Sequence, residues 1–286
     1  MPAARRTGLS QVDAQDDFLR ARRRQVLGRM GRLLLRERGD IDLILPFDEV
    51  VQAVGRLGER ELGLQVVALD TIVGTTDRQS GFDRQFRPTS ARVRARWERV
   101  AAAMRRGDPL PPVSLYRIGE AHFVRDGHHR VSAARALGWR DIDANVTEIL
   151  TRVGADRTLR LSDLPMKSQE RLFRERVPLD PSRAERIELR NPVDYGSLAE
   201  GVEAWGFRLM QERGQFLDRV EVANLWFESE FAPVVELLRD ADLIGDDTDA
   251  DAYHRLASER YELTRSHEWS DEIIALLKAS RRRRRR

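Results

Sequence analysis

Five consecutive residues near the middle of the chain have the chemistry to bind an anion. Asp126, Gly127, His128, His129 and Arg130 follow a short strand-like run and precede small and apolar residues. A helix that begins at such a turn leaves its first backbone N–H groups without partners and has a partial positive charge there. A glycine and an arginine at this place favour a phosphate or a carboxylate. We predict a phosphate-binding turn, with a nucleotide as the expected ligand.

The side chains of this turn allow further roles. Because the ordinary pKa of histidine lies near neutrality, His128 or His129 could donate to a phosphoryl oxygen or act as a catalytic acid–base group. Asp126 could hold Mg²⁺ through the nucleotide, but we favour a helix cap. A turn whose polar side chains only cap the helix is the simpler alternative. A zinc site that includes His122 is conceivable, but adjacent histidines rarely converge on one metal, so no metal is expected.

The composition excludes several classes of site. The 286 residues include no cysteine, which excludes disulfides, thiolate catalysis and cysteine metal sites. No apolar run approaches the roughly 18 residues that a membrane helix needs, so no membrane partner is expected. The first residues lack an apolar signal core, and we expect a cytoplasmic location. The net charge of +3 depends on the six arginines at 281–286; without them it is −3.

The elements around the turn predict an α/β domain. Residues 113–125 predict a β-hairpin in which Tyr116 faces Phe123 and Leu115 faces Val124. Both faces of the hairpin then carry apolar side chains, as expected of a sheet that is covered on two sides. Further strands are predicted at 64–69 and 142–149.

Two helices are expected beside this hairpin. One begins at His128 and ends before Gly138, where a left-handed residue is favoured. The other covers 90–106 and places Trp97 on its apolar side. A polar loop at 74–88 precedes it, and a loop of this length in a compact domain is more often functional than decorative.

The order of these elements resembles the ParB/sulfiredoxin superfamily over residues 64–148. The matching residues are Gly127 to Arg130, which fit a Gly-x-x-Arg box, and the alanines after it, Ala133, Ala134 and Ala136. The resemblance implies a mixed sheet with helices, and a nucleotide (CTP, or ATP or ADP, with Mg²⁺) held by two boxes. The residues it nominates are Gly127, His128, His129 and Arg130, with Asp126 beside them and Arg78 in the earlier box.

This family also implies the activities of an NTPase or a small-molecule kinase, with His128 and His129 as catalytic candidates. His128 stands where sulfiredoxins carry their catalytic cysteine, so sulfiredoxin chemistry is excluded. Partition proteins of the family follow the nucleotide domain with a helix-turn-helix, and nothing after Leu150 predicts one. A ParB-like nucleotide-binding protein is therefore our first hypothesis.

The rest of the chain predicts a separate all-α domain. Helical apolar stripes recur after residue 190, whereas prolines interrupt the segment before it. Near the start, residues 1–16 are expected to fray, and a basic helix over 17–38 to pack through Phe18, Val26 and Met30. The expected parts are a basic helical arm (1–60), the ParB/sulfiredoxin-like domain (61–150), a linker (151–190), the helical domain (191–280) and a poly-arginine tail (281–286).

Two other functions fit the same sequence. The basic N-terminal helix and the arginine tail could contact DNA, which would make the protein a DNA-associated partition or transcription-type regulator with a nucleotide switch. Runs of charge are more often solvated surface, however. A protein-interaction module with an unused anion site is the third hypothesis.

Overall fold

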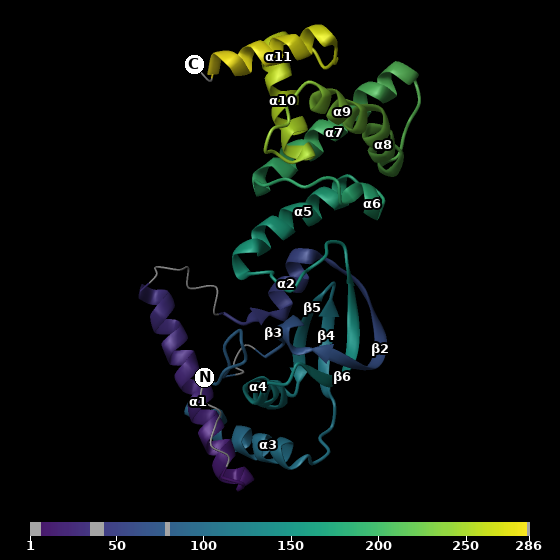
Figure 1. Cartoon of the computed structure of the whole chain (residues 1–286). Helices are drawn as coiled ribbons and strands as arrows, with labels where there is room; N and C mark the ends of the chain where they lie inside the picture. Colours follow the sequence, from purple (N-terminus) through teal and green to yellow (C-terminus); the bar gives the residue numbers. More distant parts are fainter. Residues whose placement is uncertain (1–6, 35–42, 78–80, 285–286) are drawn as a thin grey trace. The chain divides into compact units, whose positions relative to one another are not determined.

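The computed structural model describes residues 7–34, 43–77 and 81–284, and it divides into two compact units (Figure 1). The first unit extends to Ser168 and contains the sheet; the second starts at Gln169 and is helical. The chain is therefore α/β with a helical C-terminal region, as the sequence predicts at this level. The division between Ser168 and Gln169 falls inside the predicted linker at 151–190.

The first unit is built on a mixed sheet of six strands in the order β1-β3-β5-β4-β6-β2. The strands are β1 (Leu45–Pro46), β2 (Arg56–Ala68), β3 (Ile72–Thr75), β4 (Val113–Ile118), β5 (Ala121–Asp126) and β6 (Asp141–Thr151). β3 is parallel to β1 and β5, and β4 is parallel to β6. The hairpin pair β4–β5 and the pair β2–β6 are antiparallel.

The predicted hairpin is confirmed in its register. Tyr116 pairs with Phe123 and Leu115 with Val124. Leu115 and Val124 pack into one apolar core, whereas Phe123, with Tyr116 against it, packs into another. The sheet is thus covered on both faces, which explains why both rows of the hairpin are apolar.

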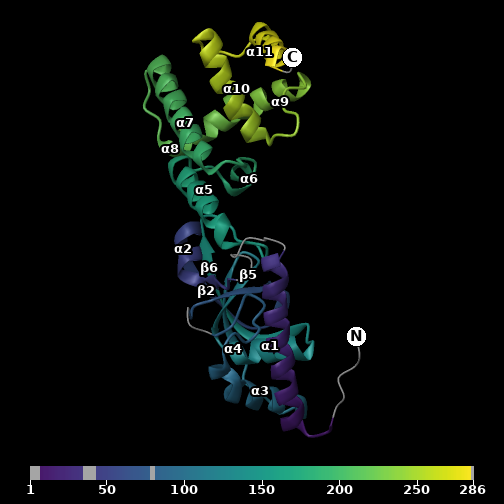
Figure 2. The ribbon, with the colours of Figure 1, turned by 90° about the vertical axis from the view of Figure 1, so that its left-hand side faces the viewer.

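Three helices cover one face of the sheet, and α2 (Phe47–Val54) packs in the core of the other. The three are α1 (Ser10–Leu34), α3 (Arg94–Arg106) and α4 (His128–Leu137). α1 packs against both α3 and α4 (Figures 1 and 2). The predicted ends are confirmed: Gly107 after α3 and Gly138 after α4 are both left-handed.

The N-terminal expectation is wrong in two respects. Helix α1 begins at Ser10, and Ala14 is fully buried, so residues from Ser10 to 16 belong to the packed helix. Phe18 is buried as predicted, but Val26 and Met30 are 45% and 57% exposed. The first strands also start before residue 60, so the sheet includes part of the predicted arm.

The first unit also contains short 3₁₀ turns at Leu69–Thr71, Ala91–Val93 and Leu161–Asp163.

The second unit consists of helices around an aromatic core. The remaining helices are α5 (Leu164–Arg176), α6 (Pro181–Ala184), α7 (Pro192–Arg213), α8 (Arg219–Trp226), a π-helical turn (Phe227–Phe231), α9 (Ala232–Asp240), α10 (Asp249–Thr264) and α11 (Asp271–Arg284). Trp226, Phe231 and Tyr253 pack against one another with ring centroids 5.2–5.8 Å apart. The side chain of Thr248 caps α10 by accepting a hydrogen bond from the backbone N–H of Asp251.

Two expectations for this region fail. Residues 151–190 are not an irregular linker, because α5 and α6 form there and Val153 and Leu159 pack into the core of the sheet unit. The tail does not begin at residue 281, since α11 extends to Arg284 and Arg281 donates to the carbonyls of Asp242 and Leu243.

Candidate functional site

The predicted anion-binding turn joins the carboxyl end of β5 to the start of α4. Gly127 has a φ of +101°, and a Cβ there would lie 2.6 Å from Cγ1 of Val113. Only glycine fits this position without strain. Gly127 is also the N-cap residue of α4, and no side chain in the described structure caps it. The first amides of α4 therefore lack a side-chain acceptor.

The role preferred for Asp126 is wrong. Its carboxylate does not cap α4; instead Oδ2 accepts a 2.6 Å hydrogen bond from Nη2 of Arg130. The helix start is left open because Asp126 turns toward the arginine four residues later, a spacing that places both side chains on one side of the turn.

Arg130 is held by internal acceptors. Besides Asp126, its guanidinium donates through Nη1 to the carbonyls of Pro111 and Pro112, the latter at 2.9 Å. The side chain is only 13% exposed. Arg130 thus ties the turn to the segment before β4, and this use was not predicted from the Gly-x-x-Arg pattern.

The two histidines lie at the start of α4, beside the rings of Phe82 and Phe86. Nε2 of His128 lies 2.6 Å from Oγ1 of Thr75, the last residue of β3. The ring of His129 stands edge-on to Phe82, at 5.3 Å between centroids, and its buried Nδ1 has no hydrogen-bond partner in the described part of the chain. β3 and β5 are parallel and both end here, so the turn lies at the carboxyl edge of the sheet, where α/β proteins bind ligands.

Burial makes both histidines neutral at pH 7. Burial, with smaller effects of the positive charge of Arg96 and of the neighbouring His128, lowers the pKa of His129 to about 4. Burial also lowers the pKa of His128, against the opposite effect of Asp77 and Asp126. Neutral imidazoles can donate or accept a hydrogen bond, but they bring no positive charge to an anion.

Arg96 is a positively charged residue near the turn that the sequence analysis does not nominate. It lies on α3 and is exposed, and its positive charge lowers the pKa of both His128 and His129, which indicates that α3 brings this charge near the turn. No ion pair of Arg96 occurs among the residues that the structure describes. Its neighbour Trp97 donates a 2.7 Å hydrogen bond to Ser132 of α4, which fixes the two helices together. The sequence gives no register between α3 and α4, so no signal in it selects Arg96 from the other arginines of α3.

The arginine-rich loop after β3 is mainly a structural cover. Arg87 pairs with the buried Asp83 at 2.7 Å, and Arg84 donates to the carbonyl of Leu159 at 2.5 Å. Phe82 and Phe86 are buried beside the histidines. Arg78, nominated for the earlier phosphate box, lies outside the described residues.

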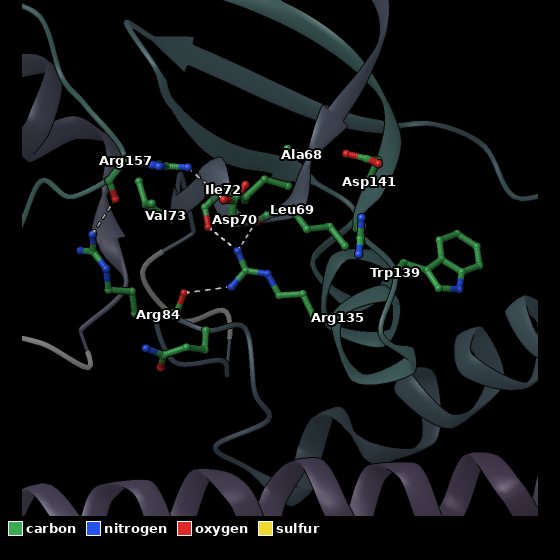
Figure 3. A pocket seen from close by; sticks show the side chains of 12 residues that line it. Ala68, Leu69, Asp70, Ile72, Val73, Arg84, Arg135, Trp139, Asp141 and Arg157 are labelled. Atoms are coloured by element: carbon green, nitrogen blue, oxygen red, sulfur yellow. Dashed lines mark hydrogen bonds and ion pairs between the residues drawn. The ribbon is translucent and has the colours of Figure 1, made fainter. Parts of the chain in front are cut away.

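A cavity of about 750 Å³ lies at the other end of α4 (Figure 3). Arg84, Arg135, Arg140 and Arg157 line it, together with Asp70 and others. Arg135 donates to the carbonyls of Leu69 and Ile72, and Arg157 pairs with Asp70 at 3.1 Å (Figure 3). Much of this charge is therefore engaged in holding the fold.

The basic N-terminal helix and His122 also make contacts inside the protein. Asp17 in α1 accepts hydrogen bonds from Arg20 and from Arg105 of α3, so both guanidiniums are paired with one internal carboxylate. His122 contacts Oγ1 of Thr71 at 2.9 Å. Within the described residues, no group of three His, Cys, Asp or Glu side chains is arranged to hold a metal ion, and no helix has the length and hydropathy to cross a bilayer.

Comparisons with protein-family models, with curated proteins and with solved structures return no match to this chain.

Proposed function

We propose that the protein binds the phosphate of a nucleotide at the turn between β5 and α4, in a domain of ParB/sulfiredoxin type. The observation that carries the proposal is the uncapped start of α4, which lies at the carboxyl edge of two parallel strands and next to the positive charge of Arg96. Backbone amides at a helix start bind phosphate through hydrogen bonds and the helix dipole.

The donors would come from three sources. The amides of His128 and His129 point along the helix axis toward the phosphate. If Thr75 gives its hydroxyl proton to Nε2 of His128, the imidazole keeps its own proton on Nδ1 as a further donor. Arg96 supplies the countercharge.

Arg130 has a different role in this proposal from the one its motif implies. With three acceptors inside the protein, it positions the turn and does not need to touch the ligand. Gly127 allows the backbone to approach the phosphate closely. The nucleotide class, CTP or ATP and ADP with Mg²⁺, and the activity of an NTPase or phosphotransferase follow from the family resemblance.

The test is a titration of the full chain with CTP, ATP, ADP and GTP, each with Mg²⁺. We expect one of them to bind, and Arg96→Gln to weaken it by about tenfold to a hundredfold, because a charge-assisted hydrogen bond contributes about 1.5–3 kcal/mol. Arg106→Gln is the matched control, since Arg106 ends the same helix and pairs with Asp108. Absence of binding by all four, or an equal effect of the two variants, would contradict the proposal.

A further inference from the structure

A second cavity lies in the helical unit, between α7, α8 and α10 and the segment after α10. Its volume is about 250 Å³. Trp226, Tyr253 and Arg260 are buried at its base, whereas Ser197, Tyr261 and His267 are exposed at its rim. It is thus an open pocket with a floor that is mostly aromatic. We call it the Arg260 cavity.

Arg260 is a buried cation whose guanidinium is only partly satisfied by the described residues. It is 4% exposed, and Nε and Nη1 are buried without an acceptor among the described residues. Nη1 lies 3.8 Å from Oε1 of Glu230, which is beyond hydrogen-bond distance. The guanidinium also stacks over Trp269, at 4.2 Å from the ring centroid.

Glu230 is occupied by other donors. Its Oε1 accepts a hydrogen bond from Nε1 of Trp269 at 2.9 Å and from the hydroxyl of Tyr253 at 3.3 Å. Buried donors are nearly always paired in folded proteins, so two buried N–H groups of Arg260 without acceptors are costly even though Glu230 offsets the charge. An acceptor that is not part of the chain explains why the guanidinium is kept there.

The charges that line the cavity leave an excess of one positive charge. Arg208 and Arg260 both line it, and Glu230 is the one carboxylate among its lining residues. Partial burial and the positive charges of Arg208 and Arg260 lower the pKa of His267, which favours its neutral form. His254 is hydrogen-bonded to Ser197 at 2.8 Å. A ligand with a single negative charge would balance the site.

We propose that the Arg260 cavity binds a small monocarboxylate, whose carboxylate accepts hydrogen bonds from Arg260 and whose apolar body packs against Trp226 and Tyr253. At about 250 Å³ the cavity is smaller than the roughly 300–1,000 Å³ of sites for drug-sized ligands, which fits a small ligand better than a nucleotide. This site is independent of the phosphate-binding turn, since all of its lining residues belong to the helical unit.

The test is calorimetric titration of the full chain with benzoate, phenylacetate and hexanoate, each compared with its uncharged amide. At least one carboxylate should bind, and its amide should bind at least about tenfold more weakly, because the hydrogen bonds to charged groups contribute about 1.5–3 kcal/mol. If no carboxylate binds at millimolar concentration, if the amides bind equally well, or if inorganic phosphate binds in preference, the proposal is overturned.

The variant Arg260→Met keeps the length of the side chain over Trp269 and removes the charge. It should weaken carboxylate binding by at least about tenfold, while Arg255→Met, on the same helix and paired with Asp247 outside the cavity, should leave it unchanged. Arg208→Met replaces Arg260→Met if that variant does not fold, and it should also weaken binding. Carboxylate binding that survives removal of the charge at both positions would overturn the proposal.

Discussion

Nε1 of Trp97 donates a 2.7 Å hydrogen bond to Oγ of Ser132, and both side chains are buried. This bond joins α3 to α4 four residues after the start of α4. It therefore sets where Arg96, the residue before Trp97, lies relative to the anion-binding turn. The positions of the cation and of the helix amides depend on this bond together with the apolar packing of α3 and α4.

Ser132→Ala should lower the free energy of unfolding by about 1–3 kcal/mol, because it leaves the indole N–H buried without an acceptor. Trp97→Phe should destabilise the Ser132→Ala protein less than the wild-type protein, because in the Ser132→Ala protein it breaks no hydrogen bond and removes a donor that is already unpaired. Urea unfolding of the four proteins measures this coupling. Fully additive effects would show that the bond does not join the helices.

Gly127→Ala should destabilise the protein more than Gly138→Ala. Both glycines have positive φ angles, +101° and +81°, so both variants strain the backbone. At Gly138 the added methyl group meets no atom within 4 Å, whereas at Gly127 it would lie 2.6 Å from Val113. We expect a difference of about 1–3 kcal/mol in unfolding free energy. Equal losses would mean that Val113 moves aside easily.

Arg130→Met should act mainly on stability. It leaves the carbonyls of Pro111 and Pro112 without their donor, and we expect a loss of about 1–3 kcal/mol. Asp126→Asn should be milder, below about 1 kcal/mol, because its carboxylate is 65% exposed and surface ion pairs contribute little. Thermal unfolding of both variants tests this order. A fully stable Arg130→Met variant that no longer binds nucleotide would instead make Arg130 a direct ligand.

Acid should destabilise the sheet unit through His122. Burial and the charge of Arg117 lower its pKa to about 4 in the folded protein, below the ordinary 6.5. Because the unfolded chain takes up the proton first, this stabilisation is complete above pH 6.5 and is lost as the pH falls toward 4. The loss is about 3 kcal/mol. In the variant His122→Gln, the free energy of unfolding should depend less steeply on pH in this window. An unchanged slope would show that His122 is not the group responsible.

The features that the sequence predicted well are those with local signals. The hairpin register follows from a two-residue turn and alternating apolar residues, and the end of α4 follows from Gly138. The full length of β2 was missed, because its outer face is polar and the register shifts near Gly58 and Gly63 break the alternation. Only residues 64–69 contain enough apolar side chains to predict a strand.

The partners of the site residues could not be predicted for a related reason. The guanidinium of Arg130 donates to the carbonyls of Pro111 and Pro112. These carbonyls come close to Arg130 only when β4 and β5 have paired. Arg96 reaches the turn only because Trp97 and Ser132 set the register of two helices. Such long-range geometry leaves no periodic pattern in a single sequence.

The central claim is that a phosphate lies on the start of α4. A crystal structure of the full chain with a non-hydrolysable nucleotide and Mg²⁺ tests it most directly. We predict a phosphate oxygen at about 2.7–3.2 Å from the backbone nitrogen of His128 or His129, with the Arg96 guanidinium toward it. Phosphates bound instead at the cavity lined by Arg84, Arg140 and Arg157, with the turn empty, would contradict the account.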